Sequence, residues 1–183
     1  DKLIDAVFHS SSGGRTENSG NVWKYQFPYL ISVVDYDQNS TKYRWLKKFN
    51  SAELRKIFSD LGGLSSIQII ERSNSGRVLN IRLVGPVGNK IITGENLRKR
   101  LQLLSTKFEL DLKFQKDNKL NKINYYNDKS NLVNNTFNDL APYPVPVIPK
   151  VYFLFVKGFG AGHGVGMSQW GAKAMAEKGA SFR

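Results

Sequence analysis

The sequence predicts an α+β fold: a mixed or antiparallel sheet, a few short helices and a cleft lined by glycine-rich loops. Strand-like and helix-like patterns do not alternate regularly along the chain, which argues against a parallel α/β sheet. The 183 residues, 40% of them apolar, suit one domain. Glycine occupies every second position from Gly158 to Gly166. This density removes side chains where the backbone must turn tightly or approach another group closely.

The N-terminal part of the chain predicts a strand, a loop and a helix. Residues 3–8 have a strand-like pattern, and a polar, glycine-rich loop follows at 9–20. Ser51 is a good N-cap for a short helix that reaches Leu61, because Leu54 and its apolar neighbours share one face and Gly62 follows.

The central part predicts a hairpin, a second helix and a further strand. Residues 67–72 and 77–84 are expected strands joined by a Ser-Asn-Ser-Gly turn, and residues 90–92 can add a third. Thr93 is then expected to cap a helix, and residues 108–114 alternate apolar and polar side chains as a half-buried strand does.

The C-terminal part begins with a change in composition. Residues 115–148 are rich in Asn, Lys and Pro and are expected to form an insertion in the single domain 1–183. We then expect a strand at 151–156 and a helix at 168–178 with Gly179 as its C-cap. The sequence opens inside a strand pattern and stops just after a helix, so both ends look cut.

The charge balance favours polyanionic partners. The net charge is +12, which suits nucleic acid, anionic lipid or acidic cell-wall polymer. Lys and Arg are spread along the chain, so a merely solvated basic surface is an equal alternative. The densest cluster, residues 42–48 (KYRWLKK), mixes cations with aromatics, a pattern typical of stacking on bases or sugars and also of an ordinary amphipathic edge.

Several common sites are excluded or weakly supported. No cysteine is present, which removes disulfides and cysteine-based zinc sites, and no apolar run is long enough to cross a bilayer. The glycine run lacks a dinucleotide-binding pattern, and Ala172 stands where a phosphate-binding loop needs lysine. The G-x-S-x-G motif of serine hydrolases is absent. His9 and His163 form no metal-binding pair in the sequence.

Hydrogen-bonding side chains beside aromatic residues remain, and they suit a sugar, whose hydroxyls need polar partners and whose ring needs an apolar platform. Trp170 is alternatively a core anchor of its helix, and Ser168 and Gln169 are alternatively N-capping residues. The candidate substrate-binding residues are His9, Ser11, Ser12, Arg15, Thr16, Trp23, His163, Ser168, Gln169 and Trp170.

Two of these segments resemble a known family. Residues 162–172 (GHGVGMSQWGA) closely resemble the C-terminal signature of the SpoIID/LytB domain family, and residues 6–16 (AVFHSSSGGRT) are similar to its Ser-Gly-Gly-x-Thr loop. The resemblance covers nearly the whole chain, apart from the insertion at 115–148. Weaker matches lie in the family's order at 28–30, 75–78, 93–98 and 104–108.

The resemblance implies peptidoglycan as the ligand. Members of the sporulation type are lytic transglycosylases that act on glycan strands stripped of stem peptides, whereas LytB-type members enhance cell-wall amidases. In the enzymes a glutamic acid protonates the glycosidic oxygen, and the muramic acid 6-hydroxyl closes an anhydro ring. That glutamate lies upstream of the Ser-Gly-Gly-x-Thr loop, outside this chain. Glu17 is in the right loop but is a weak candidate for the acid.

The resemblance leaves two functions open. The chain is either the substrate-binding part of a lytic transglycosylase or a non-catalytic glycan-binding or amidase-enhancing module. The implied partners are glycan strands and a cell-wall amidase, in a periplasmic or extracytoplasmic location, with any membrane anchor upstream of Asp1. A nucleic-acid partner is not expected, because no recognised motif accompanies the charge. Some members bind zinc through a first-loop histidine, which His9 matches, and two cysteines; these are absent, so no cofactor is expected.

Overall fold

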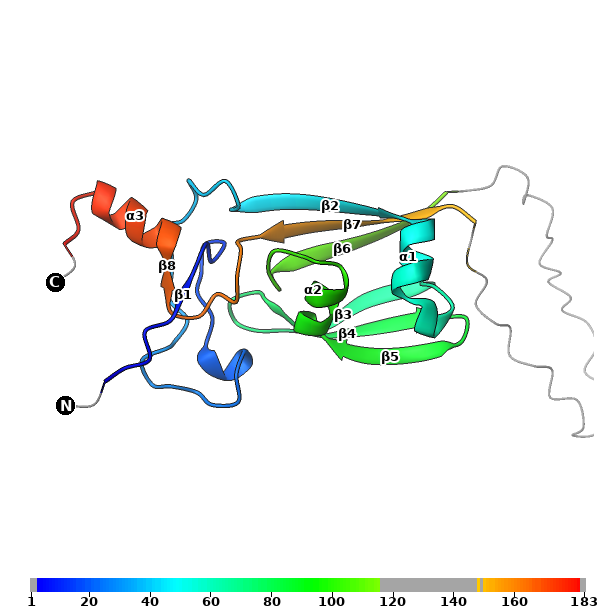
Figure 1. Ribbon diagram of the computed structural model, residues 1–183, viewed down its shortest axis with the longest axis horizontal. Coiled ribbons are helices and arrows are strands. Elements are labelled where there is room, and N and C mark those ends of the chain that lie inside the picture. Colours follow the sequence, from blue (N-terminus) through cyan, green and yellow to red (C-terminus); the bar gives the residue numbers. More distant parts are fainter. Residues whose placement is uncertain (1–2, 116–147, 149, 182–183) are drawn as a thin grey trace, which may run out of the picture.

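The computed structural model describes residues 3–115, 148 and 150–181, and shows two three-stranded antiparallel sheets with short helices beside them (Figure 1). This is the predicted α+β class. The expected insertion at 115–148 lies outside the described residues, apart from its first and last positions.

The first sheet has the strand order β2-β7-β6, from β2 (Arg44–Asn50), β7 (Tyr152–Phe159) and β6 (Phe108–Phe114). Its inner face is apolar, since Tyr152 and the alternate residues that follow it on β7 are buried. The outer face carries the remaining residues of each strand.

The second sheet has the order β3-β4-β5, from β3 (Ser66–Arg72), β4 (Val78–Gly85) and β5 (Gly88–Thr93). The register between β3 and β4 shifts near Glu71, as in a β-bulge.

The core lies between the two sheets and is closed by two helices (Figure 1). Helix α1 (Ser51–Ile57) begins in a capping box of Asn50 and Glu53, and α2 (Gly94–Arg100) begins at Thr93, whose side chain accepts from Asn96 N. The largest fully buried apolar side chains are Tyr152, Phe58, Phe108, Leu54, Leu61, Leu64, Ile81, Leu83, Leu97, Leu101 and Leu154.

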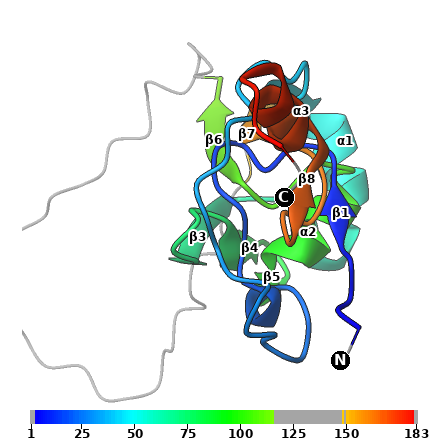
Figure 2. The ribbon, with the colours of Figure 1, turned by 90° about the vertical axis from the view of Figure 1, so that its left-hand side faces the viewer.

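The two ends of the described chain meet at the side of the sheets opposite α1 (Figures 1 and 2). Strand β1 (Phe8–His9) pairs in parallel with β8 (Met167–Ser168), and α3 (Gln169–Glu177) follows directly. The first loop, with its short 3₁₀ turn η1 (Ser19–Asn21), thereby lies against the glycine-rich segment 158–166. None of the helices in these described residues is long and apolar enough to span a membrane.

Two local predictions were wrong, and one strand was missed. Residues 3–7 form no strand, and Leu3 is 97% exposed, because no neighbouring strand covers it. The N-cap of α1 is Asn50 rather than Ser51. Strand β2 was not predicted, because its inner positions include Lys47, whose amine reaches Gln102 O and hides the alternation.

Candidate functional site

A buried carboxylate holds the first loop in shape. Asp37 accepts hydrogen bonds from the Ser11 hydroxyl and, at 2.8 Å each, from the backbone N–H groups of Gly13 and Gly14. Ser11 also exchanges backbone hydrogen bonds with Ala161. Ser11 is fully buried and its hydroxyl donates to Asp37, so its role in this structure is to stabilise the loop. Its predicted contact with glycan stays a prediction.

A second carboxylate connects the first loop to the C-terminal helix. The Ser12 hydroxyl donates to Asp35 Oδ2 at 2.5 Å. Gly171, in the first turn of α3, lies so close that a Cβ there would stand 1.7 Å from Asp35 Oδ1. Gly171 therefore lets α3 approach this carboxylate, and the predicted ligand Ser12 is one of its internal partners.

Arg15 and Thr16 attach the loop to the segment around Ser32. Arg15 Nε donates to Ser32 Oγ at 3.0 Å, and Thr16 Oγ1 accepts from Val33 N at 2.8 Å. The same backbone places Glu17 N against Gly164 O at 2.8 Å. The loop thus presents Glu17 and the residues after it to the sheets.

Arg77 is a buried cation behind the loop, at the start of β4. Its Nη2 donates to Ser12 O at 3.1 Å, and its Nη1 lies 3.4 Å from both Gly162 O and Thr106 Oγ1. Burial lowers its pKa to about 10, while the negative charge of Glu17 opposes this change. Arg77 therefore connects the first loop, the glycine-rich segment and β4.

Glu17 is the carboxylate whose negative charge acts most strongly on Arg77. Its Oε1 accepts from Asn18 N at 2.8 Å and Asn21 Nδ2 at 3.0 Å, and its Oε2 accepts from the Ser73 and Ser75 hydroxyls. Burial alone would raise its pKa, but these four hydrogen bonds outweigh burial and the pKa is lowered. Glu17 is therefore held ionised, which does not suit a general acid.

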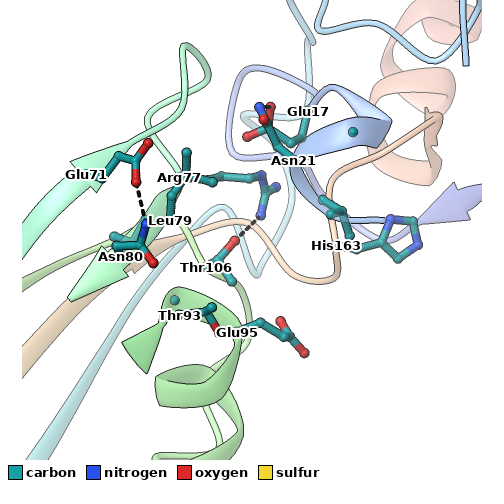
Figure 3. A pocket seen from close by; sticks show the side chains of 14 residues that line it. Glu17, Asn21, Glu71, Arg77, Leu79, Asn80, Thr93, Glu95, Thr106 and His163 are labelled. Atoms are coloured by element: carbon teal, nitrogen blue, oxygen red, sulfur yellow. Dashed lines mark hydrogen bonds between the residues drawn. The ribbon is translucent and has the colours of Figure 1, made fainter. Parts of the chain in front are cut away.

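A cavity of about 340 Å³ opens between the first loop, β4 and the start of α2 (Figure 3). Only His163 of the glycine-rich segment 158–166 lines it. Most of its lining residues are polar or charged, and dashed bonds in Figure 3 join Glu71 to Asn80 and Arg77 to Thr106. The other lining residues include Glu17, Asn21, Val22, Leu79, Thr93 and Glu95.

His163 and Trp23 form the aromatic part of the site. Their ring centroids lie 5.3 Å apart, and His9 lies 5.7 Å from His163 on the other side. Burial lowers the pKa of His163, and its Nδ1 accepts from Val165 N at 3.1 Å, so the ring is neutral at pH 7. Trp23 is 38% exposed and can offer part of its ring to a ligand.

His9 is buried behind this pair. Its Nδ1 lies 3.0 Å from Val165 O and must carry the proton to donate, which leaves Nε2 as an acceptor with no partner among the described residues. Burial lowers the pKa of His9 to about 4. The described residues contain no group of three metal-ligating side chains, so nothing here tests zinc binding.

The C-terminal candidates lie apart from the cavity. Ser168 is the N-cap of α3, with its hydroxyl accepting from Gly171 N at 3.1 Å, as the capping alternative predicts. Gln169 is exposed, and Trp170 is partly covered by Lys173, whose Nζ lies 5.0 Å from the ring centroid. None of the three lines the cavity.

The structure thus brings Glu17, Trp23 and His163 to one place and uses Ser11, Ser12, Arg15 and Thr16 to support it. Sequence reasoning missed Arg77 and the wall contributed by the second sheet and α2. The short matches to the family at 75–78 and 93–98 were the available signal, but they did not indicate the role of any single residue. The missed residues are Glu71, Arg77, Asn80, Thr93, Glu95 and Thr106.

Known proteins share this sequence over most of its length. Residues 24–127 match the family described as Domain of unknown function (DUF8618). The chain is 30% identical over 178 residues to stage II sporulation protein D of Bacillus subtilis (strain 168), covering 96% of this chain and 40% of that protein. It is 32% identical over 183 residues to the protein of the same name from Bacillus amyloliquefaciens, covering 98% of this chain and 41% of that protein.

A third relative has a different name. The amidase enhancer of Bacillus subtilis (strain 168) is 27% identical over 202 residues, covering 98% of this chain and 28% of that protein. The chain spans about two fifths of the length of the two sporulation proteins. The family match covers more than half of the chain, and these relatives match nearly all of it. The chain therefore belongs to the DUF8618 family and is a SpoIID/LytB-like protein.

Proposed function

We propose that this chain binds the glycan strands of peptidoglycan in the cavity beside His163, as part of extracytoplasmic cell-wall remodelling. The observation that carries the proposal is the cavity of about 340 Å³, where polar side chains from the sheet β3-β4-β5, α2 and the first loop converge near Trp23. This volume is in the range of small-ligand sites. The names of the relatives, stage II sporulation protein D and amidase enhancer, point to the cell wall.

The lining chemistry fits the neutral polar groups and the apolar ring face of a sugar. Asn21, Asn80 and Thr93 offer both donors and acceptors for hydroxyl and acetamido groups, and Val22 and Leu79 supply apolar surface. The indole of Trp23 beside the His163 ring gives a partly exposed aromatic edge. Glu71 and Glu95 add negative charge to this wall, and Arg77 adds a positive charge.

Cleavage of the glycan needs a proton donor that the cavity does not supply. Glu17 is held ionised by four hydrogen bonds, Glu71 accepts a hydrogen bond from the Asn80 amide, and Glu95 is paired with Arg98 at 3.0 Å. Lytic transglycosylase-type cleavage is therefore proposed with the carboxylic acid expected upstream of this chain, while the cavity described here holds the strand. An acid with a raised pKa must protonate the glycosidic oxygen before the 6-hydroxyl can close the anhydro ring.

The second candidate is a non-catalytic, amidase-enhancing module. The ionised state of Glu17 and the name of the third relative favour it. In this case the chain would hold glycan for a cell-wall amidase, and no anhydro end would form.

Calorimetric titration with peptide-free glycan strands tests the binding. Asn80→Ala and His163→Ala are expected to weaken binding at least fivefold, because both line the cavity. Gln68→Ala, on the exposed outside of β3, is the matched control. Equal binding by all three variants and the unaltered chain would refute the cavity as the glycan site.

Mass spectrometry separates the two functions. The full-length protein is incubated with the same strands, and anhydro-muramic ends are sought, first alone and then with an amidase and intact peptidoglycan. Anhydro ends in the first incubation support cleavage. Their absence, together with faster amidase release of stem peptides, supports the enhancer function.

A further inference from the structure

The outer face of the sheet β2-β7-β6 carries a row of aromatic rings beneath cations. Alternation along β7 buries Tyr152 and Leu154 and turns Phe153 and Phe155 outward, with ring centroids 6.4 Å apart. In Figure 1 this sheet forms the upper surface, with the other sheet and α2 on its inner side. The two rings are therefore on the side away from the core.

Cations flank these rings from both edge strands. Lys48 on β2 pairs with Phe155, and Lys113 on β6 pairs with Phe153. Lys48 Nζ lies 4.2 Å from the Phe153 centroid and 5.5 Å from the Phe155 centroid, and Lys113 Nζ lies 5.6 Å from the latter. Cation–π contacts thus gather the two ammonium groups above the central strand.

The charge of this face is positive. Its cations are Arg44, Lys48, Lys113 and Lys157, and its carboxylates are Glu109 and Asp111. Every one of these side chains is exposed, and Asp111 reaches Lys113 at 3.2 Å. The cavity wall instead contains three carboxylates, Glu17, Glu71 and Glu95, and one cation, Arg77. A polyanion is therefore attracted to the sheet face.

The rings do not present open stacking platforms. Because the Lys48 ammonium stands over both Phe153 and Phe155, a flat base would have to displace it. A flexible chain of phosphates can instead contact the ammonium groups where they stand, which favours a phosphodiester polymer without bases over nucleic acid.

We propose that the outer face of β2-β7-β6 binds a linear cell-wall polymer of polyol-phosphate units, separately from the glycan site. The cell-wall source rests on the proposed function, whereas the binding of phosphodiester rests on the face alone. Lys48 and Lys113 lie on the two outer strands of the three, which are about 10 Å apart, and are offset by two residues along β7, so they can contact successive parts of one chain.

The test is fluorescence-monitored titration of a labelled glycerol-phosphate oligomer over a range of salt concentrations. The double variant Lys48→Gln/Lys113→Gln is compared with Lys56→Gln/Lys173→Gln, which removes the same charge from α1 and α3. We expect the first variant to bind at least tenfold more weakly at low salt. Its slope of log affinity against log salt should fall by about 1.5, as for two lost phosphate contacts. Equal weakening in both variants would overturn the proposal.

Two further arms identify the polymer and separate this site from the cavity. Single-stranded DNA with the same number of phosphates is expected to bind more weakly; DNA binding that is as tight and as sensitive to the Lys48/Lys113 change would overturn the polyol-phosphate assignment. His163→Ala is expected to keep oligomer binding. If peptide-free glycan binds to none of the proteins while the oligomer still needs Lys48 and Lys113, the proposed function fails and the phosphodiester site stands.

Discussion

Gly164 and the guanidinium of Arg77 occupy adjoining space that no side chain at position 164 could share. A Cβ on Gly164 would lie 2.2 Å from Arg77 Nη2, and Gly164 has φ of +84°. Arg77 has little freedom to retreat, because Nη2 donates to Ser12 O and the side chain is buried. This glycine in the C-terminal signature is therefore required by an arginine in a distant part of the sequence.

Gly164→Ala is expected to destabilise the fold by about 3 kcal/mol, from left-handed backbone strain together with overpacking against Arg77. Gly179→Ala is the matched control, because Gly179 has φ of +85° but nothing within 4 Å of its would-be Cβ. It should lose only the strain contribution, about 1 kcal/mol. Urea denaturation of both variants measures the difference. Equal losses of unfolding free energy would show that the Arg77 side chain moves aside without cost.

Glu17→Gln is expected to cost about 3 kcal/mol at pH 7, because it removes the negative charge that balances buried Arg77 and replaces one of the two accepting oxygens with an NH2 group that cannot accept. The pKa of Glu17 is lowered in the folded state, so its stabilisation is present above the ordinary value of 4.5 and is lost as the pH falls through the folded pKa. The stability difference between the two proteins should therefore shrink at acid pH. A difference that is constant with pH would contradict the ionised state of Glu17.

His9 is expected to make the fold sensitive to acid at higher pH than Glu17 does. Its folded pKa of about 4 lies below the ordinary 6.5, because burial penalises the charged ring. The unfolded chain therefore takes up a proton first, so stability is full above pH 6.5 and falls as the pH drops toward 4. The loss is about 3 kcal/mol. His9→Asn, which keeps a donor toward Val165 O, should flatten this part of the profile.

A matched variant separates His9 from its neighbour. The pKa of His163 is also lowered by burial, so it contributes in the same direction. His163→Asn should flatten the profile less, since His163 is more exposed than His9. Chemical denaturation at a series of pH values measures both, and a profile unchanged by His9→Asn would contradict the buried neutral ring.

The elements that local patterns specify were predicted correctly. The Ser-Asn-Ser-Gly turn predicts the hairpin of β3 and β4. Thr93 and Ser168, the N-caps of α2 and α3, indicate where these helices begin. Strand β2 was missed because Lys47 at an inner position hides the alternation, and because its neighbour β7 lies more than 100 residues later, so the pairing adds no local signal. Residues 3–7 were overpredicted for the converse reason: they have a strand pattern but no partner strand.

The site could be predicted only in part, for the same physical reason. The glycine-rich segment and the first loop were recognised, and they do lie together through Ser11 and Ala161. The cavity wall formed by β4 and α2 depends on how the second sheet packs against the rest of the fold. The periodicity of apolar residues in the sequence does not predict this packing. The burial of Ser11 and Ser12 depends on Asp35 and Asp37, ordinary carboxylates in the sequence whose partners appear only in space.

Asp37→Asn is expected to loosen the first loop without touching the cavity wall. The amide cannot accept at both of its positions, so one of the donors from Ser11, Gly13 and Gly14 loses its partner in a buried site. An unsatisfied buried donor costs about 1–3 kcal/mol. The matched control is Asp111→Asn, since Asp111 is exposed on β6 and pairs only with Lys113 among the salt bridges of the described residues; it should change stability by less than about 0.5 kcal/mol.

Hydrogen exchange measured by mass spectrometry locates the effect of Asp37→Asn. Peptides covering residues 10–16 and 158–164 should exchange faster in the variant, because Ser11 and Ala161 join these two segments. Peptides from β4 should keep their protection, since the Arg77 contacts to Thr106 and Gly162 do not involve Asp37. Faster exchange across both sheets would mean that Asp37 supports the whole fold. In that case the first loop could not be changed independently of the cavity it borders.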